Sequence, residues 1–196
     1  YSLVAAVALV LLSVLAVSAE PPATVQGQLV NGSKGGSPVP GLEVTLRPSS
    51  PEGGPDQQAT TDPDGNFLFS ILTATAPVSY TLSASYAGVL YRGPGLNFGP
   101  GERLRRVNLW VYDTTEDSSS IQADLTHVVI EIDPGAQTLV VSQYQAFSNG
   151  GDKTYLGLAS TRSEKRLSLR FPLPQGAVHV QPINGLVVDD LVSLPQ

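Results

Sequence analysis

The chain has 196 residues, a formal net charge of −6 and only 14% charged residues. Nucleic-acid binding relies on clustered Lys and Arg, so this acidic composition argues against a nucleic-acid partner. The absence of cysteine excludes disulfides and thiol chemistry, and the 19 Gly and 16 Pro with few charges favour a loop-rich β protein.

The N-terminus carries an apolar segment typical of exported proteins. Residues 2–19 are almost wholly apolar, and Val17-Ser18-Ala19 matches the small-residue pattern that signal peptidase recognises. We therefore predict a signal peptide over residues 1–19. An uncleaved N-terminal anchor is the alternative, since a helix of this length spans about 27 Å. Either way the rest is expected to be extracytoplasmic, secreted or at the cell surface, with membrane contact only here or through an anchor beyond Gln196.

A first module is expected over residues 23–113, as strands joined by turns. Alternating apolar and polar side chains predict strands at residues 25–30, 43–47, 67–69, 78–86 and 105–112. The turn sequence Asp62-Pro63-Asp64-Gly65 precedes Phe67 and Phe69, which fall on one face and are expected in the core. Strands with this spacing and no helical periodicity predict an all-β sandwich.

Four segments of this module carry recognisable turn and strand motifs: VQGQLV at 25–30, VPGLEVTL at 39–46, TDPDGNFLF at 61–69 and YTLSA at 80–84. Together they resemble the carboxypeptidase regulatory-like domain family. The resemblance implies a seven-stranded, transthyretin-like (prealbumin-like) sandwich of Ig-like type over residues 23–113. It further implies a non-catalytic accessory or cell-surface module, in a group sometimes classed with carbohydrate-binding folds.

A second, incomplete β-sandwich-like module is expected over residues 121–196. The polar, acidic residues 114–120 before it are predicted to be a linker. Residues 121–132 and 138–147 predict a hairpin around the turn Asp133-Pro134-Gly135. Farther on, the alternation from Leu167 to Leu173 predicts a half-buried strand.

No metal, cofactor or catalytic group is expected. His127 and Glu131 lie about 13 Å apart if they share a strand, too far to bind one ion. Asp62 and Asp64 resemble half of a calcium loop, but turn geometry already accounts for them, and the distal Glu of a complete loop is missing. The sequence lacks the Gly-x-Ser-x-Gly motif and the phosphate-binding glycine loop, so we expect no enzyme.

One strand suggests a ligand surface. Arg106, Asn108, Trp110 and Tyr112 share a face of the strand predicted at 105–112, where the two aromatic rings could stack on sugars beside polar donors. The competing interpretation is that Trp110, close to the module boundary, packs in an interface between modules.

Three functions stay open at this point. The leading hypothesis is an exported, non-catalytic structural or interaction module of the cell envelope or secreted space, whose partner is a cell-envelope protein or a polysaccharide. The alternative is a carbohydrate-binding accessory module that uses the Trp110 strand. A second alternative is an accessory domain of a larger exported enzyme. The exposure of Trp110 separates the first two.

Overall fold

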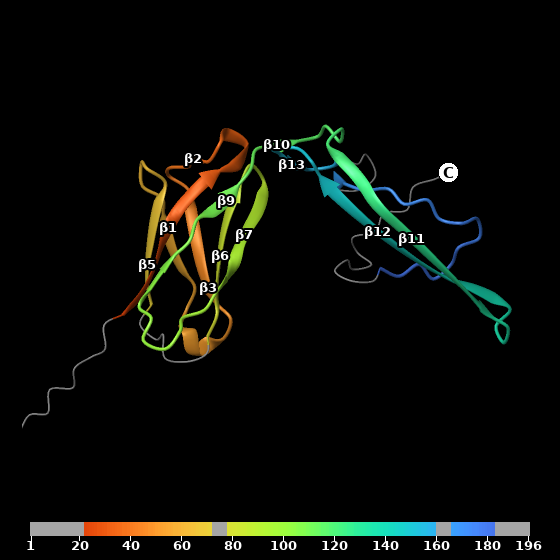
Figure 1. Cartoon of the computed structure of the whole chain (residues 1–196), viewed down its shortest axis with the longest axis horizontal. Coiled ribbons are helices and arrows are strands. Elements are labelled where there is room, and N and C mark those ends of the chain that lie inside the picture. The colour runs from red at the N-terminus through yellow and green to blue at the C-terminus, as the bar shows by residue number, and fades with distance from the viewer. Residues whose placement is uncertain (1–21, 72–77, 160–165, 183–196) are drawn as a thin grey trace, which may run out of the picture.

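The computed structural model describes residues 22–71, 78–159 and 166–182, and its regular structure is almost entirely β (Figure 1). The helical pieces in these ranges are two single 3-10 turns, η1 (Gly32–Lys34) and η2 (Pro51–Gly53). No helix in the described ranges is long and apolar enough to cross a membrane. The predicted signal peptide at 1–19 lies outside the described residues.

Two sheets form a sandwich in the first module (Figure 1). The first sheet contains β1 (Ala23–Asn31), β2 (Ser37–Pro38), β5 (Asn66–Ile71), β8 (Leu104–Arg106) and β9 (Leu109–Val111). The second has the order β4-β3-β6-β7, from β3 (Glu43–Pro48), β4 (Gln57–Thr60), β6 (Tyr80–Tyr86) and β7 (Val89–Leu96). The all-β fold predicted from the sequence is confirmed. If β8 and β9 count as one strand and the two-residue β2 is set aside, the described sandwich has seven strands.

Strand β1 is the central strand of the first sheet. One side of it pairs antiparallel with β5, and the other side pairs parallel with β8 and then with β9. Between these two parallel ladders the backbone at Val107 passes very close to Gly27. A Cβ added at Gly27 would lie only 1.6 Å from the Val107 carbonyl oxygen. The strand predicted at 105–112 is therefore divided in two at the point where it crosses Gly27.

The core lies between the two sheets. The side chains predicted to point inward do so: Phe67 and Phe69 are buried, and their rings lie 5.9 Å apart. The buried apolar cluster comprises Ala23, Val25, Leu29, Val44, Leu46, Phe67, Phe69, Val78, Tyr80, Leu82, Ala84, Leu96, Leu109 and Val111. At roughly 1.5–3 kcal/mol for each large apolar side chain buried, this cluster is the main source of stability in the sandwich.

The second part of the chain begins with strand β10 (Thr114–Thr115), which pairs parallel with β13 (Thr154–Tyr155). Part of the segment predicted to be a linker is therefore a strand. Between β10 and β13 the chain forms a long hairpin of β11 (Ile121–Asp133) and β12 (Thr138–Asn149), as predicted, which extends away from the sandwich (Figure 1).

The described residues of the second part contain no pair of packed sheets and no buried apolar cluster. Beyond the hairpin, the chain forms the two-residue strands β14 (Leu158–Ala159) and β15 (Arg166–Leu167). The strand predicted from Leu167 to Leu173 ends after its first residue, because Leu167 already pairs with Leu158, the first residue of its ladder partner β14.

Candidate functional site

The outer face of the first sheet brings together side chains from four strands, β1, β5, β8 and β9. Gln26 of β1 lies between Leu68 of β5 on one side and Arg106 of β8 on the other. Farther along the same face, Val30 pairs with Trp110 of β9. We call this surface the Trp110 face and define it by Gln26, Gln28, Leu68, Arg106, Asn108 and Trp110.

Alternation in the sequence explains why these side chains face outward. Val107, Leu109 and Val111 pack against or within the core, whereas Arg106, Asn108 and Trp110 between them are exposed. In β5, Leu68 lies between two buried phenylalanines and is itself 60% exposed. The face is thus an open sheet surface with an apolar side chain toward each end and polar groups between them.

The indole ring of Trp110 lies beside Gly36 and Val30 and is about half exposed to solvent. Its indole ring lies near Gly36, with ring carbons 3.7 and 3.8 Å from the place where a Cβ would stand, and its neighbour Val30 is buried. The indole remains 48% exposed. The packing holds the ring in position and leaves area available for stacking on a ligand.

The polar groups beside the ring have free hydrogen-bonding capacity. Gln28 Nε2 donates to the Asp64 carbonyl oxygen at 2.7 Å, which fixes the amide and leaves its Oε1 as an acceptor. In the described part of the chain, Arg106 and Asn108 form no side-chain hydrogen bond or ion pair. An amide and a guanidinium are therefore available to a ligand lying across the face.

Tyr112, which alternation places on the same face as Trp110, lies beyond the end of β9 and makes its contacts near the junction with the second part. Its ring packs against Gly32 and lies 6.2 Å from the ring of Tyr91. Tyr91 Oη donates to the Tyr112 carbonyl oxygen at 2.8 Å. Strand β9 ends at Val111, so the chain has already turned toward the second part at Tyr112, and this ring serves the junction instead of the ligand surface.

The junction is organised by Asp113. Its Oδ1 accepts hydrogen bonds from Asn31 Nδ2 at 2.8 Å and from Tyr86 Oη at 2.9 Å. Lys34 Nζ lies 3.5 Å from its other carboxylate oxygen. The hydrogen bond from Asn31 first, and then that from Tyr86, holds the pKa of Asp113 below its ordinary value of 3.8.

This arrangement predicts a loss of stability in acid. A carboxylate whose pKa is lowered by folding stabilises the fold above its unfolded pKa, and that contribution disappears as the pH falls through the folded pKa. We expect the wild-type melting temperature to decrease below about pH 4, and the difference between wild type and Asp113→Asn to shrink over the same range. Asp64→Asn is the matched control, since this carboxylate accepts no hydrogen bond from the described residues. A constant difference from pH 6 to pH 2 would contradict the role assigned to Asp113.

The acidic turn before β5 is accounted for by its own backbone. Asp62 Oδ1 accepts from the backbone N–H of Asp64 at 2.9 Å and of Asn66 at 2.8 Å, and these bonds close the turn. The hydrogen bonds from Asn66 lower the pKa of Asp62. Nowhere in the described ranges do three His, Asp or Glu side chains gather closely enough to hold a metal ion.

No family model matches the sequence, and no curated protein matches it. Among solved structures, the chain is similar to a candidate carbohydrate-binding protein from Pseudomonas aeruginosa, with 16% identity and a TM-score of 0.34 over 49% of this chain and 92% of that one. It is also similar to a DUF3823 family protein from Parabacteroides merdae, with 11% identity and a TM-score of 0.33 over 66% of this chain and 59% of that one. A candidate carbohydrate-binding protein from Bacteroides uniformis gives 15% identity and a TM-score of 0.29 over 67% and 55%. These likenesses are too distant to assign a ligand to the chain.

Proposed function

We propose that the first module is a non-catalytic carbohydrate-binding module that acts outside the cytoplasm, and that the Trp110 face is its ligand surface. The observation that carries the proposal is the half-exposed indole of Trp110, which lies near Gly36 and beside Asn108 and Arg106, two side chains that have no partner among the described residues. Burial of Trp110 between the two parts of the chain would have favoured a purely structural role instead.

The chemistry of the face fits a sugar chain better than a small molecule. An aromatic ring offers an apolar plane to the C–H side of a sugar ring, while amide groups can both donate to and accept from sugar hydroxyls. An open sheet surface cannot enclose a small ligand in the way that a cleft does. The spread from Leu68 to Trp110 instead suits an extended polysaccharide that spans several strands.

Trp110 is the only tryptophan in the chain, so its fluorescence reports directly on the proposed site. We expect acrylamide to quench the full-length protein efficiently, and one class in a panel of neutral and acidic polysaccharides to protect the indole. Trp110→Ala should weaken retention of the protein in gels containing that polysaccharide by about tenfold, equivalent to about 1.4 kcal/mol.

Leu90→Ala provides the matched control for this experiment. Leu90 lies in β7 of the other sheet and is exposed to the same fraction, 48%, as Trp110. Removing it should leave retention unchanged. If no polysaccharide protects Trp110, or if both substitutions weaken retention equally, the Trp110 face is not the ligand surface.

Two further parts of the proposal, export from the cytoplasm and membership of a family, rest on the sequence. The apolar N-terminal segment supports export, and the turn and strand motifs of residues 25–84 support membership of the carboxypeptidase regulatory-like group. A structural or interaction role remains the second candidate, and the observation that favours it is the large apolar exposure of the β11–β12 hairpin.

A further inference from the structure

The β11–β12 hairpin has two chemically different faces. The ladder pairs Ile130 with Val141 and Ile132 with Leu139, so these four side chains lie together near the hairpin turn. We call the side that carries them the hairpin face; toward the sandwich it continues through Val128 and the pair of Ala123 and Phe147. The opposite face contains Leu125, His127, Val129, Glu131, Val140 and Tyr144.

The hairpin face near the turn is an unusually exposed apolar surface. Ile132 is 76% exposed and Leu139 is 62% exposed, and their neighbours Ile130 and Val141 are also exposed. A two-stranded hairpin is marginally stable by itself, and clustered apolar groups of this kind mark a site of association.

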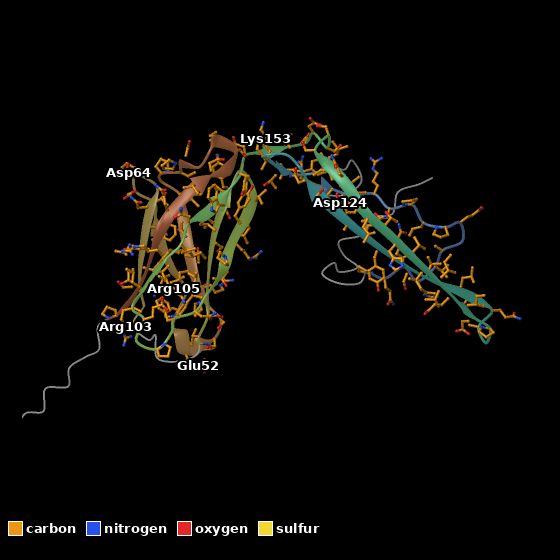
Figure 2. All side chains as sticks on the ribbon, viewed as in Figure 1. Glu52, Asp64, Arg103, Arg105, Asp124 and Lys153 are labelled. Carbon is orange, nitrogen blue, oxygen red and sulfur yellow. The ribbon has the colours of Figure 1, made fainter. Side chains whose placement is uncertain are left out.

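The absence of charged side chains on the hairpin face allows the same face of a second copy to pack against it. Every side chain of the hairpin face from β11 and β12 is uncharged, and the hairpin contains no Lys or Arg. Its three acidic groups lie elsewhere: Glu131 pairs with Val140 on the opposite face, and Asp124, near the sandwich end of the hairpin, accepts a hydrogen bond from Ser148 (Figure 2). Asp133 follows Ile132 in the last pair of the ladder, and its carboxylate accepts from the backbone N–H groups of the turn. Stacking two hairpin faces therefore leaves the acidic groups of both copies in water.

The base of the hairpin supplies a matching hollow. A hollow of about 330 Å³ is lined by Ile121 and Phe147 of the hairpin face, by Leu169 from the segment after β15, and also by the more polar residues Ser148, Asn149, Thr154, Tyr155 and Ser168. Phe171 from the same segment packs edge-on against Phe147, with ring centroids 6.0 Å apart. The same element thus carries an apolar projection at its tip and an apolar hollow at its base.

We propose that two copies of this chain associate by stacking their hairpin faces head to tail, so that Ile132 and Leu139 of each copy enter the hollow of the other. This arrangement has two-fold symmetry, and each copy contributes the same surface, as closed dimers require. In this dimer the apolar side chains near the tip of each hairpin are buried against the base of the other hairpin.

The size of the surface predicts a reversible dimer. A two-stranded face of this length measures about 40 Å by 10 Å, so two stacked copies bury on the order of 800 Å², at the small end for specific complexes. The association is accordingly expected in the micromolar range or weaker, and to depend on protein concentration.

Two lysine substitutions test which face is used. Sedimentation of the full-length chain from 1 to 200 µM should show a monomer–dimer equilibrium, and Ile132→Lys should weaken it at least tenfold. Val140→Lys is the matched control: it places the same charge at the same end of the hairpin, but on the opposite face beside Glu131. Association through the apolar N-terminal segment would respond to neither substitution and would overturn the proposal, as would a strict monomer.

Single cysteines test the head-to-tail orientation, because the chain has none of its own. Leu139→Cys marks the tip and Ala123→Cys marks the base, both on the hairpin face. A mixture of the two variants should form a disulfide-linked dimer under mild oxidation, whereas either variant alone should link at least tenfold less. Efficient linking of Leu139→Cys to itself would show that the tips meet and would overturn the head-to-tail arrangement.

Discussion

Gly27→Ala is expected to lower the free energy of unfolding by about 3 kcal/mol, at the upper end for an overpacked site. An added Cβ would lie 1.6 Å from the Val107 carbonyl oxygen and 2.8 Å from the ring of Phe67. The Val107 carbonyl belongs to the backbone, which cannot move aside as the end of a flexible side chain can. The strand that runs from β8 to β9 would have to move away from β1.

The measurement is urea denaturation of the full-length chain, followed by Trp110 fluorescence, since Trp110 lies in β9 on the displaced strand. Gly95→Ala is the control, because Gly95 is also a strand glycine but nothing lies within 4 Å of its added Cβ. Its effect should stay within about 0.5 kcal/mol of zero. Equal effects of the two substitutions would show that the crossing at Gly27 is looser than described.

Phe67→Ala and Phe69→Ala are each expected to cost about 3–5 kcal/mol, the usual range for truncating a buried phenylalanine. Both rings are almost fully buried, and they contact each other between the two sheets. Removing either ring leaves a cavity that the close-packed neighbours fill only in part.

Leu68 provides an internal control from the same strand. It lies between the two phenylalanines but is exposed on the Trp110 face, so Leu68→Ala should change stability by less than about 0.5 kcal/mol. Comparing the three variants in one denaturation series checks the facing of β5 directly. A loss below about 1 kcal/mol for both phenylalanines would show that the inward face has been assigned incorrectly.

Local alternation was sufficient to predict most of the individual strands. In the strand predicted at 78–86 the apolar positions Val78, Tyr80, Leu82 and Ala84 are all buried, although β6 itself begins at Tyr80, because burial on one side and solvent on the other fix such alternating positions. The long hairpin was also predictable, since the Asp133-Pro134-Gly135 turn separates two strand-forming segments.

The composition of the Trp110 face could be predicted only in part. Arg106, Asn108 and Trp110 follow from alternation in one strand. Gln26, Gln28 and Leu68 join them only because β1 pairs with β5 on one side and with β8 and β9 on the other, and local sequence does not contain that pairing. Tyr112 follows the same alternation but lies beyond the end of β9, and alternation cannot show where a strand stops.

The second part of the chain shows a different limit of sequence reasoning. Its strands do alternate apolar and polar residues. Alternation indicates that one face is apolar, but it does not show which part of the protein packs against that face. In the hairpin the consecutive apolar residues 128–130 and 139–141 place apolar side chains on both faces, and the bulge between Ala123 and Leu125 moves Leu125 to the face opposite Ala123. An incomplete sandwich-like module was therefore predicted where the described residues form one long exposed hairpin and two ladders of two-residue strands.

The place of β1 in the first sheet also determines the order in which the sandwich can be completed. Thr24 pairs with Leu104, and Asn31 pairs with Val111. One edge of β1 can therefore pair only with strands about eighty residues later in the chain. Contacts of such long range slow folding, because the intervening loop must be closed before the pairing stabilises anything. During synthesis, β1 stays unpaired along that side until β8 and β9 have been made. The sandwich is therefore expected to close late and in one cooperative step, on a timescale of roughly milliseconds to seconds.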